Sequence, residues 1–374
     1  MDYWHQKQII KNIFALNYLS FRALAVLVSV LFIVTLGQFR WLRSSDGGIE
    51  HVRYYDYFDN YAALSEIIKG ANKPNPIRAG AIELPAVMLQ SYGFETVDGH
   101  GAIFFRRYKE IFKEIILDQL TTQAAKDSYD NNWYDYLLRN NGPLCLPLLE
   151  MLNVRYLLSP SRITYLEAYG CSVVEIWPDR TKLLPRQYND PLFLYELPNW
   201  FPRGYLVSRS VVLPSDNQIL SEMRRHSSND LRQMVFLKEG EFPKRVLSEL
   251  NNCNDSQAQA AIIKYKPDYI VFKVKTKGPK ILVISNNFHS KWEAYIDGIK
   301  TEVFRVNHAL QGVFINKPGE FRVTLQYHDP LLWFSHAAIP VGVLFKLIGF
   351  SLCAPSNWRD SLRIRRRVKE DLPG

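Results

Sequence analysis

The chain has 374 residues, of which 47% are hydrophobic and 13% aromatic, so it is long enough for two domains with a sizeable core. Its net charge is +9, but the basic excess gathers near the two ends, beside two apolar segments. This distribution argues against the basic stripe of a nucleic-acid-binding protein and is typical of charges that flank a membrane.

The first apolar segment, Ala23–Phe39, carries no charge and lies between Arg22 and Arg40. It is just long enough to cross a bilayer if the two arginines reach the interfaces. The sequence therefore predicts a transmembrane helix at 23–41 that follows a cytoplasmic segment, 1–22. A cleaved signal peptide and a buried soluble helix are the alternatives. The long lead and the lack of an A-x-A-like cleavage site argue against the signal peptide.

Residues 44–200 mix helical and strand patterns and are expected to form an extracytoplasmic α+β domain. An apolar stripe predicts a helix around Tyr61–Lys69. Tyr108, Ile111 and Ile115 recur near the helical period and predict another helix. Further elements are expected in the second half of this domain, namely a short buried helix at Leu144–Leu152 and strands at Val154–Ser159, Cys171–Ile176 and Phe193–Leu197.

The second predicted domain, 201–330, is an extracytoplasmic antiparallel β-sandwich. It is expected to open with one strand, Tyr205–Leu213, and a helix, Asp216–Arg225. Charged and polar residues dominate 221–259, which predicts a solvated, loop-rich insertion before the strands resume at Ala261.

The stretch 281–327 alternates between apolar and polar residues and contains two turn signals. Asp297-Gly298 suits a two-residue hairpin, because that turn needs positive φ at both central positions. Pro318-Gly319 suits a type II turn. After this turn, apolar residues recur at every second position, as in a half-buried antiparallel strand: Phe321, Val323, Leu325 and Tyr327.

The second apolar segment predicts a transmembrane helix at 331–353, although it contains His336 and Lys346. Lys346 can extend its ammonium group toward the nearer basic end. The arginine-rich tail, 354–374, marks that end as cytoplasmic by the positive-inside rule. The predicted fold class is thus an α+β unit followed by an antiparallel β-sandwich, bracketed by two transmembrane helices in the cytoplasmic membrane.

The sequence contains no G-x-S-x-G elbow, P-loop, G-x-G-x-x-G or H-E-x-x-H motif, so no catalytic residue and no cofactor is predicted. The best polar cluster contains glycines, which let the backbone approach a ligand, and arginines, which pair with phosphate. We therefore expect a sugar- or phosphate-binding site at Asp98, His100, Arg106, Arg107 and Tyr108. A surface turn that begins a helix, with its arginines in solvent, is the simpler alternative.

A second candidate for sugar binding is Trp292, whose ring could stack on a sugar while Asp297 binds hydroxyl groups. A core tryptophan beside a turn aspartate would explain the same residues. The histidines lack H-x-H or H-x3-H spacing, so no metal site is predicted. Cys145 and Cys171 could form a disulfide bond, and buried free thiols are the alternative.

Several short segments resemble the YfhO family of bacterial membrane proteins, which have a glycosyltransferase C-type architecture. The resemblance covers roughly residues 50–353 and rests on the order and spacing of Leu152–Leu158, Pro202–Val207, Lys291–Tyr295, Asp297-Gly298, Arg305–Asn307 and Pro318-Gly319. It implies the extracytoplasmic portion of a glycosyltransferase-like protein that handles cell-envelope glycans with a polyprenyl-phosphate-linked sugar donor.

Proteins of this architecture carry a multi-helix half with a catalytic acidic residue, which the resemblance does not cover. A separate multi-spanning partner is therefore expected. The alternative is a non-enzymatic, membrane-anchored protein that binds a glycan or serves as a scaffold. The expected partners are the bilayer, a polyprenyl-phosphate sugar and an envelope glycan, and no nucleic acid is expected.

Overall fold

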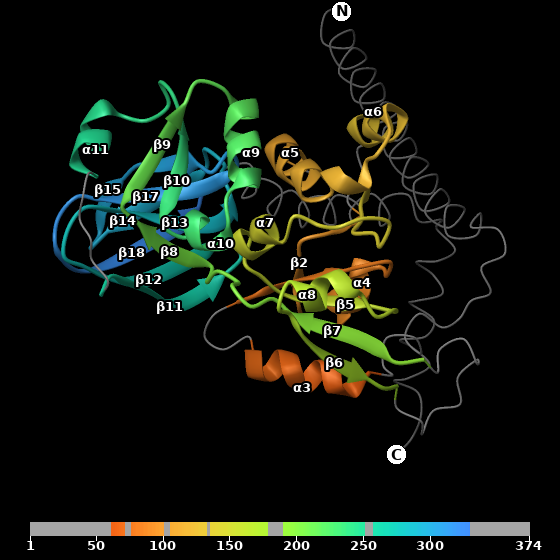
Figure 1. Cartoon of the computed structure of the whole chain (residues 1–374). Coiled ribbons are helices and arrows are strands. Elements are labelled where there is room, and N and C mark those ends of the chain that lie inside the picture. Colours follow the sequence, from red (N-terminus) through yellow and green to blue (C-terminus); the bar gives the residue numbers. More distant parts are fainter. Residues whose placement is uncertain are drawn as a thin grey trace, which may run out of the picture. The chain divides into compact units, whose positions relative to one another are not determined.

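The computed structural model describes residues 61–71, 76–100, 105–132, 135–178, 190–250 and 257–329. Nearly all of them belong to one compact unit, Val52–His328. Within this unit a helix-covered sheet comes first along the chain and a pair of packed sheets follows (Figure 1).

The first part of the unit is built around a mixed five-stranded sheet in the order β2-β1-β5-β7-β6. β1 runs parallel to β2 and β5, whereas β7 runs antiparallel to β5 and β6. The strands of this part are β1 (Arg78–Ala81), β2 (Glu95–Thr96), β5 (Val154–Ser159), β6 (Ser172–Ile176) and β7 (Leu192–Glu196), with the short pair β3 (Gly99–His100) and β4 (Asp135–Tyr136). The helices are α3 (Ala62–Ala71), α4 (Ala86–Ser91), α5 (Arg106–Ile115), η1 (Leu117–Gln119), α6 (Gln123–Asn131), α7 (Leu146–Met151) and α8 (Thr164–Ala168).

Helices pack on both faces of this sheet. α3 and α4 cover one face, where Leu64 and Met88 lie in a core cluster with Leu158. α5, α7 and α8 cover the other face. Four apolar residues of α5 fall on one side of the helix because they follow its period, and all four are buried: Tyr108, Ile111, Phe112 and Ile115.

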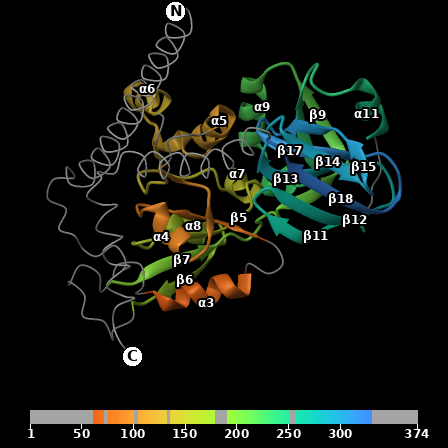
Figure 2. The same ribbon diagram turned by 180° about the vertical axis from the view of Figure 1, so that it is seen from behind.

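The second part is a sandwich of two antiparallel sheets with the orders β11-β12-β18-β14-β15 and β16-β17-β13-β8. The two sheets lie one behind the other (Figure 2). Their inner faces meet in a core in which Phe272 and Leu325 of one sheet join Leu282 and Val313 of the other. The strands are β8 (Gly204–Val207), β11 (Gln259–Lys266), β12 (Tyr269–Thr276), β13 (Lys280–Asn287), β14 (Trp292–Ile296), β15 (Ile299–Thr301), β16 (Val303–Val306), β17 (Leu310–Ile315) and β18 (Gly319–Tyr327).

A parallel strand pair and three helices lie between β8 and the rest of the sandwich along the chain. The elements are β9 (Arg209–Leu213), α9 (Asp216–Arg225), α10 (Ser228–Leu231), β10 (Met234–Lys238) and α11 (Lys244–Glu249). One large hydrophobic core connects these elements with α5, α7 and β13, so it extends across both parts of the unit.

The hairpin predicted at Asp297-Gly298 is confirmed: it joins β14 to β15, and its φ values are +50° and +85°. The type II turn predicted at Pro318-Gly319 is wrong, because Gly319 has a φ of +145° instead of about +80°. This segment leads from β17 in one sheet to β18 in the other, so it does not connect neighbouring strands.

The predicted fold class needs a correction. The structure shows an α+β protein with several antiparallel sheets, and within its described segments no helix is both long and apolar enough to cross a bilayer. The spans predicted at 23–41 and 331–353, like the flanking segments 1–22 and 354–374, lie outside the described residues.

The loop-rich insertion predicted at 221–259 is also wrong over most of its described length. β10 pairs with β9, and its residues Met234, Val235, Phe236 and Leu237 are buried. The single strand predicted at Tyr205–Leu213 is two strands, because β8 pairs with β13 whereas β9 pairs with β10.

Candidate functional site

A polar pocket of about 610 Å³ lies where α5, α9 and β10 meet the segment after β13. α5 and its preceding residue contribute Phe105, Arg106, Arg107 and Glu110. The start of α9 contributes residues 215–217, and Lys238 and Phe288 complete the lining. We call this cavity the polar pocket. Its walls therefore come from both parts of the unit.

The N-termini of two helices open onto the polar pocket. Phe105 precedes α5 in an extended conformation, and no side chain caps the helix there. Ser215 precedes α9, and its hydroxyl accepts a hydrogen bond from the Gln218 amide. α5 and α9 lie side by side (Figures 1 and 2). The first residues of both helices thus line one cavity, at the positive ends of the two helix dipoles.

Asp216 is held by cations on two sides. Arg305 Nη1 donates to its Oδ1 at 2.8 Å, and Lys238 Nζ lies 3.2 Å from its Oδ2. Burial alone would raise the pKa of Asp216, but the hydrogen bonds and charges of Arg305 and Lys238 outweigh it and lower this pKa to about 2. Asp216 is therefore an ionised, fully engaged carboxylate at neutral pH.

Glu110 is engaged in a similar way. Arg106 Nε donates to its Oε1 at 3.0 Å, and its Oε2 lies 2.7 Å from Nε2 of the buried His308. The other ring nitrogen of His308 is 3.4 Å from Asp216 Oδ1. Burial lowers the pKa of His308, although the two carboxylates act in the opposite direction. His308 thus holds Glu110 through Nε2, whereas its buried Nδ1 lies beside Asp216 without forming a hydrogen bond.

His308 owes its position to an unusual turn between β16 and β17. Asn307 and His308 have φ values of +45° and +66°, a conformation that costs non-glycine residues free energy. Tertiary contacts hold the turn in place. The Asn307 side chain accepts a hydrogen bond from the Phe236 amide at 2.8 Å, and the His308 carbonyl accepts one from Arg305 at 2.9 Å.

The structure separates the residues of the predicted site. Arg106 and Arg107 line the polar pocket, whereas Asp98 and Tyr108 point into the fold. The Asp98 carboxylate accepts hydrogen bonds from the Ala81 amide at 3.2 Å, and burial raises its pKa to about 8.

The remaining members of the predicted site lie elsewhere. The Tyr108 hydroxyl donates to the Val97 carbonyl. Only the backbone of His100, in β3, is described. Trp292 begins β14, packs partly on the sandwich core and makes an edge contact with Tyr327. Cys145 and Cys171 are free thiols.

Sequence reasoning missed several residues of this site, namely Glu110, Asp216, Lys238, Arg305 and His308. Only the first of them has a local signal, because it lies one helical turn after Arg106 and forms an i,i+4 ion pair with it. The others come together through the tertiary fold. Within the described residues, no group of three or more histidine, cysteine or acidic side chains is placed to hold a metal ion.

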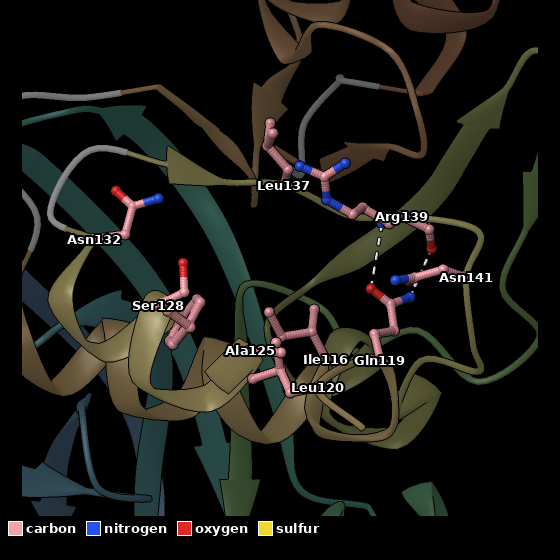
Figure 3. A pocket seen from close by; sticks show the side chains of 10 residues that line it. Ile116, Gln119, Leu120, Ala125, Ser128, Asn132, Leu137, Arg139 and Asn141 are labelled. Atoms are coloured by element: carbon pink, nitrogen blue, oxygen red, sulfur yellow. Dashed lines mark hydrogen bonds between the residues drawn. The ribbon is translucent and has the colours of Figure 1, made fainter. Parts of the chain in front are cut away.

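A second, smaller pocket of about 250 Å³ lies between η1, α6 and the segment after β4. Ile116, Leu120 and Leu137 give it apolar walls (Figure 3). Its central amide, Gln119, donates to the carbonyls of Arg139 at 2.6 Å and Gly142 at 3.0 Å. These bonds fix the surrounding loop, so Gln119 serves the structure here, and the polar pocket is the better functional candidate.

Comparison of the chain with protein-family models, curated proteins and solved structures finds no match. The polar pocket therefore has to be interpreted from its own chemistry.

Proposed function

We propose that the polar pocket binds the phosphate-bearing part of a glycan ligand, and that the chain handles this glycan in a glycosyltransferase-like assembly. One observation carries the proposal: the N-termini of two helices meet at a single cavity that also contains Arg107. Helix N-termini provide N–H donors and a positive partial charge, which together favour an anion.

The charges around the pocket support an anionic ligand. Glu110 and Asp216 are already paired with cations, as described above. Arg107 is exposed and forms no ion pair with any residue that the structure describes. An arginine of this kind can form two parallel hydrogen bonds to a phosphate group.

The state of the Asp216 carboxylate supports binding more than acid–base catalysis. A general base needs a pKa near the working pH, whereas the pKa of Asp216 is about 2. Asp216 therefore suits a binding role within the proposed assembly, and the same role fits a second candidate function, a glycan-binding or scaffold protein without catalysis of its own. The glycan part of the proposal rests on the resemblance to the YfhO family and on Phe105 and Phe288, whose rings offer apolar contact area beside the charges.

Calorimetric titration of the full-length chain with glucose 1-phosphate, inorganic phosphate and glucose tests this proposal. We expect both phosphate compounds to bind and glucose alone to bind much more weakly. Arg107→Ala should weaken phosphate binding by at least about tenfold, because a hydrogen bond to a charged group contributes about 1.5–3 kcal/mol.

The matched control is Arg322→Ala, which removes an exposed arginine from β18. Its affinity for both phosphate compounds should equal that of the unmodified chain. An equal loss in the two variants would indicate general charge attraction and would count against the pocket. If neither phosphate compound binds the unmodified chain, the proposal is wrong.

A further inference from the structure

We propose that a row of aromatic side chains next to the polar pocket binds the sugar residues of an extended glycan. This inference rests on the proposed function, because it extends the phosphate site into a track for a longer ligand. The row consists of Phe105, His289, Tyr327 and Trp292, and we call it the aromatic row. Phe105 belongs to both the pocket and the row.

The four rings are in continuous contact. The ring centroids of Phe105 and His289 are 5.9 Å apart, those of His289 and Tyr327 5.6 Å, and those of Tyr327 and Trp292 5.6 Å. Trp292 and Tyr327 lie directly opposite each other at the ends of β14 and β18. His289 lies in the segment that connects β13 to β14. The aromatic row therefore runs from the pocket across one end of the sandwich.

The rings of the row are partly open to solvent. Phe105 is 50% exposed, and the other three side chains are half-buried. Trp292 packs on the sandwich core with part of its ring only. A row of four contacting, partly accessible rings beside a polar cavity offers flat apolar area together with polar groups, the combination found in ligand sites.

The polar groups of the row are also available to a ligand. His289 Nδ1 accepts a hydrogen bond from the Lys291 amide at 3.2 Å, which leaves the ring proton on Nε2. That Nε2 group, the Tyr327 hydroxyl and the Trp292 indole N–H have no hydrogen-bond partner among the described residues. None of these atoms is among the buried unpaired atoms of the described part, so each one reaches solvent.

The combination of flat apolar rings with open hydrogen-bonding groups matches the chemistry of a sugar. The C–H face of a sugar ring packs against an aromatic ring, while its hydroxyl groups bind donors and acceptors at the ring edge. The neighbouring pocket supplies the site for a phosphate group at one end of the chain. A glycan that carries a phosphate would therefore contact both surfaces at once.

The experiment measures affinity as a function of glycan length, with malto- and chito-oligosaccharides of two to six residues and with glucose 1-phosphate. We expect affinity for at least one oligosaccharide series to rise roughly fivefold or more over the first residues, as each ring contact forms. His289→Asn should abolish much of this rise. It removes the ring, but its side-chain oxygen can still accept the hydrogen bond from the Lys291 amide.

A second variant, Trp292→Leu, keeps apolar packing on the core and removes the indole ring. Both variants should bind glucose 1-phosphate as well as the unmodified chain does. If glucose 1-phosphate binds but neither oligosaccharide series shows a length dependence, the aromatic row is not a glycan track. The same conclusion follows if the length dependence survives both substitutions. A third outcome is that glucose 1-phosphate fails to bind while the oligosaccharides show a length dependence that His289→Asn removes. The aromatic row is then supported as a glycan track, and the proposed phosphate site is wrong.

Discussion

Two aspartates of this protein show how strongly the surroundings decide the behaviour of a single residue. Asp98 is buried beside the Ala81 amide, and burial raises its pKa to about 8. Asp216 lies between Arg305 and Lys238, which lower its pKa to about 2 against the effect of burial. At neutral pH the first therefore favours its neutral form, whereas the second is ionised. Only Asp216 lines the polar pocket.

Asp98 should make stability depend on pH. Its pKa in the folded chain, about 8, exceeds the unfolded value of about 3.9, so the folded state binds the extra proton between these values. The stabilisation of the folded state by this proton is complete below a pH of about 4 and is lost as the pH rises through 8. Urea unfolding between pH 5 and 9 should show the free energy of unfolding falling by at most about 1.4 kcal/mol per pH unit from this residue.

The comparison that isolates this effect is Asp98→Asn, which cannot titrate. As the pH rises to 8, the unmodified chain should steadily lose unfolding free energy relative to this variant. Asp127→Asn, at an exposed position of α6, should show no such shift. A constant difference for Asp98→Asn across the whole range would contradict the assignment.

At the scale of secondary-structure elements, the sequence predicts those helices and turns whose formation depends on neighbouring residues in the chain. α5 could be predicted because Tyr108, Ile111 and Ile115 recur at helical spacing and so place their apolar side chains on one face of the helix. The hairpin at Asp297-Gly298 follows from the φ values that this turn requires. β10 escaped prediction because its apolar residues stand among polar ones, and its burial depends on β9 and the shared core.

The same distinction explains the candidate site. Arg106 and Arg107 could be chosen from the sequence because they are neighbours in the chain and suit phosphate chemistry. Asp216 and His308 could not, because the fold brings them to Glu110 from distant positions. Asp98 shows the opposite error: a polar residue beside a glycine resembles a ligand-binding loop, yet its carboxylate bonds to the protein backbone.

β8 provides a test of packing at this scale. A Cβ atom at Gly204 would lie 2.3 Å from the ring of Phe272, which is fully buried in the sandwich core. Gly204→Ala should therefore force the ring to move and lower the free energy of unfolding by about 1–3 kcal/mol, measured by urea denaturation. Gly142→Ala cannot serve as a neutral control, because the added Cβ would meet backbone atoms of Asp118. An unchanged midpoint for Gly204→Ala would show that the core adapts without cost.

At the scale of the whole described unit, a partly buried charge cluster joins the first sheet to the sandwich. Arg203, which is fully buried, donates to Glu95 at 2.5 Å and to Asn286 at 3.2 Å. The Tyr265 hydroxyl donates to the other oxygen of Glu95. Arg78 lies 3.7 Å from the same carboxylate and donates to the Ser285 carbonyl. Two guanidinium groups thus share one carboxylate, so both arginines of the cluster depend on Glu95 for their negative partner.

Glu95→Gln should weaken the connection between the two parts. It keeps the shape of the side chain but leaves Arg203 and Arg78 without their shared negative charge. We expect a loss of about 2 kcal/mol in the free energy of unfolding, a value that allows for the partial exposure of Glu95. Glu239→Gln, at an exposed position after β10, should change stability little. Equal stability of the two variants would show that the cluster contributes no net free energy.

The turn at Asn307 and His308 has a consequence for how the protein reaches its folded form. Its position depends on the register of β16 against β17, and a slip by one residue would turn every side chain of the strand to the opposite face. His308 would then no longer meet Glu110, whose Oε2 would lose its partner at the wall of the polar pocket. A chain with a misregistered hairpin would keep its helices and still lack the arrangement of the proposed anion site. If the proposed phosphate site is correct, its ligand affinity is a direct reporter of correct strand pairing in the sandwich.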